Sequence, residues 1–492
     1  MTVRLFNTLT NTVENLEPSD GETLRIYVCG PTVYDYGHIG NFRTFLQLDV
    51  LRRFLQQKGR KLLQVMNITD VDDKIIRNAA AAHLDIGEYT KKYERAFFQD
   101  LDALCCERPE IVARATENIP QMVALIERLA AKDLAYRAPD GSWYFRIAGF
   151  PEYGKLSKKD FSAINDGARV DLDEYDKDSA RDFALWKAAK PGEHQWNTAL
   201  GSGRPGWHIE CSAMALRYLG ESFDLHAGGE DLMFPHHENE IAQSESATGK
   251  PLAYHWMHVR FLLVDGRKMS KSEGNFFTLR DLLLKGFRAS AIRFLLISVP
   301  YRHPLNFTTE GLTESAAAVE RVRTFSQRIR GGEWPAGLNA ELEAQTRKAQ
   351  QNYCAALEDD LNTSNARAAI FDLVRAGNVA ADSGKLFAGN VPAILETLRR
   401  FDEVFCLLED RDAEIARGAL QWAQDEGRGG EAAPEMVAAY SLSDQQIDAL
   451  LAEREQARRS RNFARSDSIR NQLAALGIVI EDSKEGARWK RK

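Results

Sequence analysis

The chain has 492 residues, of which 44% are hydrophobic and 27% are charged, and its formal net charge is −7. This length exceeds what one hydrophobic core supports, so we expect several domains of ordinary globular composition. The sequence has no apolar run of the ~20 residues that a membrane span needs and no secretory signal, which predicts a cytoplasmic protein that does not enter a membrane.

Two further bulk features limit the function. The negative charge argues against a broad, non-specific nucleic-acid binder, although a local basic patch remains compatible with it. The six cysteines, at positions 29, 105, 106, 211, 354 and 406, do not resemble a disulfide framework. In a large cytosolic chain they are expected to be free thiols or metal ligands.

The first predicted elements follow a strand, helix, strand pattern. A strand over residues 24–28 ends at Cys29, a helix is expected from about residue 40 to residue 59, and a second strand covers 62–66. That strand runs into the polar loop 67–73. Ligands of parallel α/β sheets bind at the carboxyl ends of the strands, so both loops are candidate parts of a site.

The rest of the chain alternates between helical and mixed patterns. Residues 90–136 are predicted to be helical, and 137–204, with short strands and turns, indicate an insertion between two halves of a nucleotide-binding fold. Strand and helix signals resume over 207–264, and 313–423 is predicted to be helical. A flexible linker is expected over 425–434, followed by a capping box at 443–446 and a small unit with a helix over 467–476 and a strand over 478–480.

Two short motifs have the chemistry to bind phosphate. His38-Ile39-Gly40-Asn41 places a histidine and a glycine at the mouth of a helix, where the helix dipole favours anions. Lys268-Met269-Ser270-Lys271-Ser272 follows an apolar strand, and two lysines on a loop can neutralise a triphosphate as pyrophosphate leaves. Either motif alone is more often an ordinary turn, but the two together make that interpretation hard to sustain.

Possible metal ligands gather in the middle of the chain. Seven of the ten histidines fall between positions 194 and 258, with Cys211 among them. His236 and Glu240 are i,i+4 neighbours if a helix starts near Pro235, whereas His237 and Glu240 are i,i+3, so spacing does not choose between the two histidines. With Cys29 from the first loop, these side chains are all acceptable zinc ligands.

The two phosphate motifs resemble the two signatures of class I aminoacyl-tRNA synthetases. Residues 27–35, 206–214 and 234–240 resemble the cysteinyl-tRNA synthetase family in particular, and the similarity extends over essentially the whole chain. Asn41 stands where histidine is usual in this family, and Ala227 stands where several members have glycine. Asparagine still donates a hydrogen bond, so retained activity is expected.

The resemblance implies a reaction and a set of residues. Cysteine would be activated by ATP to an adenylate and transferred to the 3′ end of tRNA(Cys), with one Zn²⁺ per chain selecting the thiol and Mg²⁺ accompanying ATP. The implied site residues are the following: for zinc, Cys29, Cys211, His236 and Glu240; for ATP, His38, Gly40, Asn41, Lys268 and Lys271; for cysteine, Gly30, Thr69, Trp207, His226 and Asp231. Because zinc separates cysteine from serine, no editing domain is expected.

The resemblance also implies a fold and a domain order. We expect an α/β protein in which a Rossmann-like parallel-sheet catalytic domain carries an insertion and is followed by a helical bundle and a small C-terminal α/β anticodon-binding unit. The expected ranges are 1–115 and 205–255 for the catalytic halves, 116–204 for the insertion, 256–312 for the lysine loop and stem-contact region, 313–424 for the bundle, 425–440 for the linker and 441–492 for the C-terminal unit.

The basic C-terminal segment is expected to contact tRNA through Arg461, Arg465, Arg488 and Trp489, because arginines beside an aromatic ring suit single-stranded bases. A solvated helix with internal ion pairs is an equally good interpretation of any single arginine. Two rival functions are a ligase that joins cysteine to a small amine and a non-enzymatic RNA-binding paralogue. The intact basic tail argues against the first, and the intact ligands and lysines argue against the second. A monomer is expected.

Overall fold

The computed structural model describes residues 2–159, 169–170, 182–190, 192–483 and 486–491. These residues form two compact units. The first comprises 1–276 and 293–408, and the second comprises 277–292 and 409–492. Part of the predicted insertion, at 160–168, 171–181 and 191, lies outside the described residues. Of the helices in the described ranges, none combines the length and hydropathy that a membrane crossing needs.

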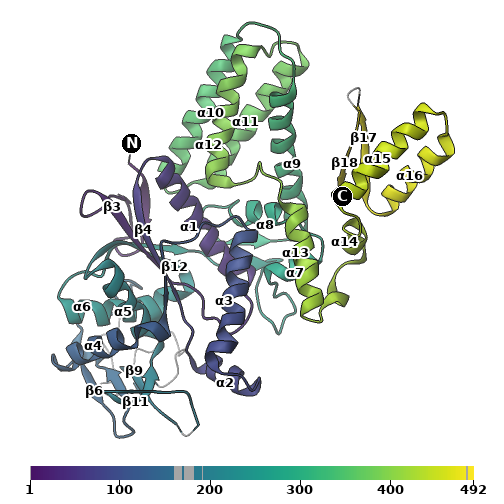
Figure 1. Cartoon of the computed structure of the whole chain (residues 1–492). Coiled ribbons are helices and arrows are strands. Elements are labelled where there is room, and N and C mark those ends of the chain that lie inside the picture. Colours follow the sequence, from purple (N-terminus) through teal and green to yellow (C-terminus); the bar gives the residue numbers. More distant parts are fainter. Residues whose placement is uncertain (1, 160–168, 171–181, 191, 484–485, 492) are drawn as a thin grey trace. The chain divides into compact units, whose positions relative to one another are not determined.

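A parallel sheet with the strand order β13-β12-β3-β4-β5 is the centre of the first unit (Figure 1). Its strands are β3 (Thr23–Val28), β4 (Lys61–Ile68), β5 (Ile111–Arg114), β12 (Phe223–Gly229) and β13 (Ala253–Val259). From β3 the chain adds β4 and β5 on one side, and it later adds β12 and β13 on the other. The order therefore reverses between β3 and β12, which is where a parallel sheet opens a ligand crevice beyond its carboxyl ends.

Helices connect and cover these strands. α1 (Ile39–Gln57) joins β3 to β4, α2 (Asp73–Ala81) and α3 (Ile86–Ala103) join β4 to β5, and α6 (Glu238–Thr248) joins β12 to β13. α1 begins where predicted because His38 and Asn41 form a capping box: the His38 ring accepts from the Asn41 amide at 3.2 Å, and the Asn41 side chain accepts from the His38 amide at 3.1 Å.

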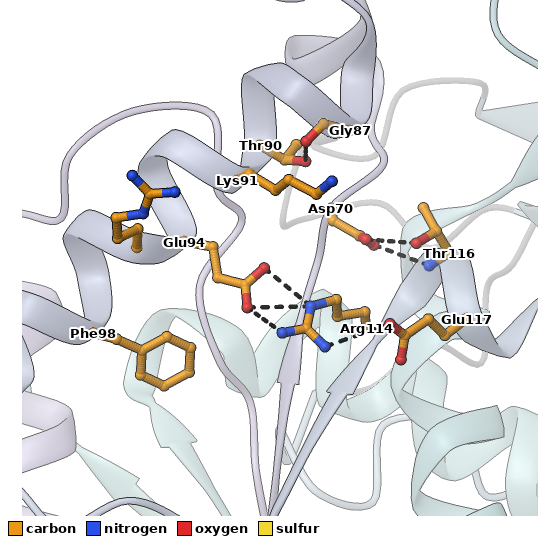
Figure 2. Close-up of a pocket in the computed structure, with 10 residues that line it drawn as sticks. Asp70, Gly87, Thr90, Lys91, Glu94, Phe98, Arg114, Thr116 and Glu117 are labelled. Atoms are coloured by element: carbon orange, nitrogen blue, oxygen red, sulfur yellow. Dashed lines mark hydrogen bonds and ion pairs between the residues drawn. The ribbon is translucent and has the colours of Figure 1, made fainter.

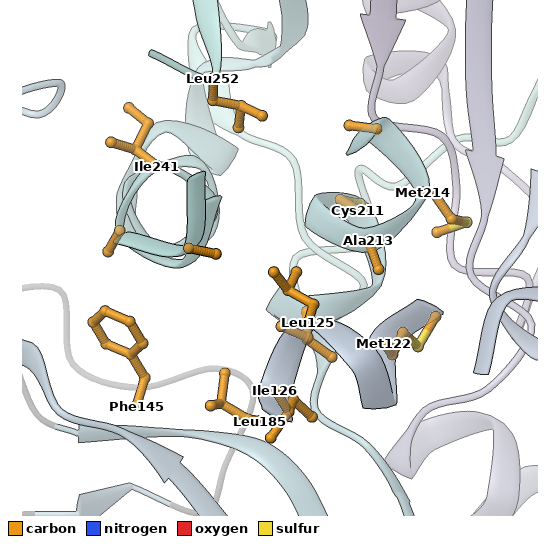
Figure 3. Close-up of a cluster of buried hydrophobic side chains, with 14 of the residues drawn as sticks. Met122, Leu125, Ile126, Phe145, Leu185, Cys211, Ala213, Met214, Ile241 and Leu252 are labelled. Carbon is orange, nitrogen blue, oxygen red and sulfur yellow. The ribbon is translucent and has the colours of Figure 1, made fainter. Parts of the chain in front are cut away.

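The insertion is a mainly antiparallel sheet between α4 (Ile119–Ala130) and α5 (Trp207–Leu219). Its strands follow the order β10-β11-β9-β7-β6, with β8 beside β9. They are β6 (Ala135–Arg137), β7 (Trp143–Phe145), β8 (Arg169–Val170), β9 (Asp182–Ala188), β10 (Trp196–Thr198) and β11 (Gly201–Pro205). Figure 3 shows how a buried apolar cluster joins this sheet, through Phe145 and Leu185, to side chains of α4, α5 and α6.

The remaining elements of the first unit are two small sheets and a helical bundle. The chain starts with a hairpin of β1 (Arg4–Asn7) and β2 (Thr12–Asn15), and a sheet of β14 (Leu262–Val264), β15 (Arg267–Lys268) and β16 (Leu305–Phe307) carries the lysine motif. The bundle consists of α9 (Thr309–Gly331), α10 (Ala340–Glu358), α11 (Thr363–Asp382) and α12 (Val391–Phe405).

The second unit contains α7 (Leu279–Leu284), α13 (Asp412–Asp425), α14 (Pro434–Ala439), α15 (Asp444–Arg459) and α16 (Phe463–Ala475), and the chain returns to the first unit within α8 (Ala289–Leu296). It ends with the antiparallel pair β17 (Ile478–Ser483) and β18 (Gly486–Arg491). The parallel sheet, insertion, bundle and small C-terminal α/β element confirm the predicted fold class.

Three local predictions are corrected by the structure. Residues 90–136 are not uniformly helical, because β5 and β6 lie within them; β5 has only four residues after Pro109, too few to show a period in the sequence. The expected linker contains the helix α14, and this helix buries Met436. α14 starts at Pro434, and proline suits the first turn of a helix as well as it suits a loop. Finally, α6 begins at Glu238, three residues after Pro235.

Candidate active site and metal centre

Four segments meet at the crevice between β3 and β12. Cys29 follows β3 directly and its amide still donates to Ala227 of β12 at 3.2 Å. Cys211 lies on α5, His236 in the turn before α6, and Glu240 in the first turn of α6. All four side chains are buried, and their potential ligand atoms lie within 4.8 Å of one another.

The distances within this cluster are those of groups that share one ion. The two sulfurs are 3.9 Å apart, the Glu240 Oε1 lies 3.6 Å from the Cys29 sulfur, and the same oxygen is 3.1 Å from the His236 Nε2. Two thiols, an imidazole and a carboxylate form a complete donor set for zinc. The donor chemistry therefore fits the metal that the sequence predicts.

A second, overlapping donor set is present, so the choice between the two histidines stays open on geometry alone. It consists of Cys29, His226, His237 and Glu240, which are also all buried. His226 Nε2 is 3.0 Å from the second Glu240 oxygen, and His237 Nε2 is 3.3 Å from the Cys29 sulfur. His237 also contacts His258 through its other ring nitrogen at 2.8 Å.

Charge is strongly organised inside the cluster. Burial disfavours the Cys211 thiolate, but a hydrogen bond from Cys29 and the nearby His236 lower the pKa of Cys211 to about 6. Burial likewise opposes ionisation of Glu240, yet His226 and His236 lower the pKa of Glu240 to about 2. Burial and the neighbouring Cys211 raise the pKa of Cys29. Burial opposes protonation of His236, but Cys211 and Glu240 raise the pKa of His236 to about 10, so the cluster pairs its two buried anions with a positive charge at the position of a candidate ligand.

The residues predicted to hold the amino acid surround this cluster. The Trp207 ring stacks on His236 with centroids 4.2 Å apart, and His226 stacks on Trp256 at 4.4 Å. The Thr69 hydroxyl donates to Glu210 at 3.0 Å.

One glycine and one acid are the remaining members of the predicted amino-acid pocket. A β-carbon on Gly30 would lie 1.8 Å from the Asn67 carbonyl oxygen, so no other residue fits there. Asp231 lies in the helical turn after β12 and acts electrostatically on His38.

The two phosphate motifs also come together. A β-carbon on Gly40 would meet the His38 ring at 3.0 Å and the Met269 methyl group at 3.4 Å, so the glycine allows the motifs to approach. Lys271 forms an ion pair with Asp35 at 2.7 Å and lies over the Phe276 ring, while Lys268 is exposed on β15. Burial lowers the pKa of His38 to about 4, so its ring is neutral at neutral pH.

Sequence patterns did not single out two carboxylates at this site. Asp35, the ion-pair partner of Lys271, lies three residues before His38. The sequence signal that could have identified Asp35 is a single acid in the loop before one phosphate motif, because such an acid can pair with a lysine of the other motif. Glu210, the buried acceptor of the Thr69 hydroxyl, lies next to Cys211 among apolar residues of α5. A carboxylate on a buried helical face needs a partner, which marks it as a candidate.

A cavity of about 430 Å³ lies beside the loop after β4 (Figure 2). Asp70 points into it and accepts from the Thr116 amide at 2.9 Å and the Thr116 hydroxyl at 2.6 Å, and Glu94 pairs with Arg114. Its lining has as many acidic as basic side chains, so it has no charge preference and we assign it no ligand.

The residues predicted to contact tRNA lie in the second unit. Arg461 and Arg488 are exposed, Arg465 pairs with Glu453 at 2.7 Å, and the Trp489 indole donates to Asp448 at 2.7 Å. Arg465 thus fits the solvated-helix interpretation as well as the tRNA one.

Comparisons with known proteins place the chain in a family. Family models match residues 15–317 as a class I (C) tRNA synthetase catalytic domain, 352–409 as a DALR domain, and 443–489 as a cysteinyl-tRNA ligase anticodon binding domain. Curated relatives named cysteine–tRNA ligase include those of Koribacter versatilis, 56% identical, and Solibacter usitatus, 53% identical, each with 100% of both chains covered.

Solved structures agree at the level of fold. Methionyl-tRNA synthetase of Mycobacterium tuberculosis in complex with methionyl-adenylate is 16% identical, with a TM-score of 0.56 over 86% of this chain and 96% of that one. A putative arginyl-tRNA synthetase of Campylobacter jejuni has a TM-score of 0.54 at 14% identity, over 79% of this chain and 92% of that one. With the full-length relatives and the matching catalytic-domain model, the chain belongs to the cysteine–tRNA ligase family of class I tRNA synthetases.

Proposed function

We propose that the protein attaches L-cysteine to tRNA(Cys) in two steps, forming cysteinyl-adenylate from ATP and then transferring cysteine to the tRNA 3′ end. The observation that carries this proposal is that the loop after β3 holds both Cys29 of the buried cluster and His38, on which Asp231 after β12 and Lys271 of the lysine motif act electrostatically. Full-length membership of the cysteine–tRNA ligase family supports the same reaction.

In the first step, the amino-acid carboxylate attacks the α-phosphate of ATP and pyrophosphate leaves, with Mg²⁺ on the phosphates. The protein contributes mainly positioning and charge stabilisation. Because the His38 Nδ1 accepts the Asn41 amide, the neutral ring carries its proton on Nε2 and can donate it to a phosphate oxygen. Lys268 and Lys271 supply positive charge, and Gly40 admits the nucleotide close to the helix mouth.

Asn41 has a defined part in this scheme. Its side-chain oxygen accepts the His38 amide within the capping box, which leaves its NH₂ group to donate. The residue therefore holds His38 in place and still offers a hydrogen bond to ATP. This supports retained activity despite the departure from histidine, since no positive charge is required at that position.

We assign zinc to Cys29, Cys211, His236 and Glu240 in preference to the set with His226 and His237. Two sulfurs make the first set the softer site, which zinc favours over one with a single thiolate. Bound there, zinc would take the substrate thiolate as an additional ligand and leave the hydroxyl of serine a poor one.

The amino-acid pocket follows from the same arrangement. Gly30, Thr69, Trp207, His226 and Asp231 would surround the substrate, and the buried Nδ1 of His226 has no partner among the described residues, so a substrate group would satisfy it. An apolar pocket alone would separate cysteine from serine by only about 100-fold. Thiol ligation removes that limit, so we propose that the insertion at 116–204 does not hydrolyse mischarged tRNA.

The second step needs tRNA placed across the chain. We propose that the bundle at 313–424 and the stem-contact region at 256–312 bind the body of tRNA, and that the C-terminal unit at 441–492 contacts the anticodon through Arg461, Arg465, Arg488 and Trp489. The anticodon-binding family model at 443–489 supports the last assignment. We further propose that the protein acts as a monomer in the cytoplasm.

Two assays on one preparation test the function. Cysteine-dependent exchange between ATP and labelled pyrophosphate measures adenylate formation, and transfer of labelled cysteine to tRNA(Cys) measures the second step. We expect both activities. Exchange without transfer to tRNA would instead indicate a ligase that uses a small amine, and the absence of both would indicate an RNA-binding paralogue.

A further inference from the structure

Two cysteines outside the proposed site face each other at the ends of two helices of the first unit. Cys105 comes just after α3, and Cys406 ends α12 as its cap residue. Both have left-handed backbone conformations, with φ of 56° and 53°. Glycine or asparagine is usual at such a helix end, because a β-carbon costs about 1–2 kcal/mol there. Two cysteines at paired positions of this kind need a reason beyond backbone preference.

Two arginines hold these helix ends side by side. The buried Arg293 guanidinium donates to the carbonyl oxygens of Leu104 and Cys105 at 2.8 and 3.1 Å. The same group donates to those of Phe405 and Val404 at 2.7 and 3.2 Å. Arg53 adds donors to Cys105 at 2.8 Å and to Glu403 at 3.3 Å. Five backbone carbonyls from two distant segments are thus held by two guanidinium groups, which places Cys105 and Cys406 beside each other, and the Cys406 side chain lowers the pKa of Cys105.

The surroundings favour reactivity at Cys105. The hydrogen bond from Cys406 lowers the pKa of Cys105 to about 6; burial opposes this, while Arg293 and Arg53 assist it. Asp49, which forms ion pairs with both arginines, raises the pKa of Cys105, but the net shift of that pKa is still downward. Cys105 and Cys406 are half-buried, whereas Cys106 beside them is buried. A thiolate next to cations with a second thiol in contact is the arrangement of redox-sensitive cysteines.

We propose that Cys105 and Cys406 are a redox-sensitive pair that forms a reversible intramolecular disulfide in the presence of hydrogen peroxide. The Cys105 thiolate attacks the peroxide oxygen, which breaks the O–O bond and, with a proton from solvent, releases water and leaves a sulfenic acid. The Cys406 sulfur then attacks that sulfenic sulfur, its proton leaves with the hydroxyl as a second water, and the disulfide forms. The two thiols lose two electrons in total, and the peroxide gains them. A dithiol reductant restores both thiols.

The bond would join the end of α3, the helix that leads into β5 of the parallel sheet, to the end of α12 in the helical bundle. A crosslink between segments so distant in sequence removes conformational freedom from the unfolded chain, and the arginines already hold the native separation. Oxidation therefore stabilises the first unit, with an expected rise in the apparent Tm of roughly 5 °C.

The test uses the full-length protein with zinc in excess, treated with stoichiometric hydrogen peroxide. Remaining thiols are then alkylated, and peptides are mapped by mass spectrometry without reduction. We expect a Cys105–Cys406 crosslinked peptide that dithiothreitol removes, together with the rise in Tm. Peptides in which Cys105 is unoxidised, oxidised to a sulfinic acid without a crosslink, or linked to Cys106 would each overturn the proposal.

Matched variants separate chemistry from folding. Cys406→Gly suits the left-handed position, so the reduced variant should be at least as stable as the parent. It should form no crosslink and show no rise in Tm with peroxide. Cys354→Ser, which removes another half-buried thiol, on α10, should respond as the parent does. A peroxide-dependent rise in Tm of equal size in Cys406→Gly would contradict the proposal.

Discussion

The two ends of the proposed active site differ in burial and in bonding. At the cysteine end, His226, His236, His237 and Glu240 are at most 1% exposed, and each contacts another member of the cluster. At the phosphate end, the Lys271 side chain is 64% exposed and its partner Asp35 40% exposed. Selecting one sulfur atom requires fixed, water-free donors, whereas charge released as pyrophosphate is met by side chains that can rearrange.

The largest effect is expected from breaking the buried end. Cys29→Ser should abolish zinc content and cysteine-dependent exchange together, with a loss greater than the roughly 100-fold that removal of an outer-shell partner costs. The measurements are metal analysis of the purified variant and the exchange rate. Cys354→Ser is the matched control and should leave both unchanged. Full zinc occupancy in Cys29→Ser would show that the assigned ligand set is wrong.

At the exposed phosphate end, we expect a substitution to lower activity without loss of zinc. Lys271→Ala should lower the exchange rate by about 100-fold, because a charge that stabilises the transition state is removed, and should leave zinc content unchanged. Arg267→Ala, at an exposed neighbouring position on β15, is the control and should have little effect. If Lys271→Ala also lost zinc, the two ends would not be the separate parts described above.

Substitutions of the neighbouring His236 and His237 test which of the two is a zinc ligand. His236→Asn should weaken zinc binding by more than 100-fold as a lost ligand, and His237→Asn by about 10-fold, as a lost partner of Cys29. Competition with a chromogenic chelator measures both affinities. The reverse order would favour the donor set with His226 and His237 over the one proposed here.

The smallest effect is expected at Asp35. If Lys271 binds ATP as proposed, its ion pair with Asp35 competes with that contact, and because the pair is exposed it contributes no more than about 1 kcal/mol. Asp35→Asn should therefore lower the KM for ATP by about 2- to 5-fold with little change in kcat. Initial-rate exchange assays over a range of ATP concentrations measure this. An increase in KM would indicate instead that Asp35 positions the lysine for catalysis.

Sequence patterns predicted the parts of this site that have local signals. The helix after His38 has a capping box and an apolar face, and both motifs are contiguous in sequence, so their positions followed directly. The choice between His236 and His237 did not, because it depends on how the turn before α6 presents each ring to Cys29 and Cys211. The four-residue β5 and the ion pair between Asp35 and Lys271, 236 positions apart, are likewise products of tertiary packing.

We propose that the buried cluster selects cysteine by ligating its sulfur through a bound metal. Replacing zinc with Co²⁺ makes this visible, because thiolate-to-cobalt charge-transfer absorption grows with each sulfur ligand. With Cys29 and Cys211 already bound, adding L-cysteine should increase that absorption by about half, as a third sulfur joins two, while L-serine at the same concentration should leave it unchanged. An absorption that does not change with cysteine, or that changes equally with serine, would contradict the account.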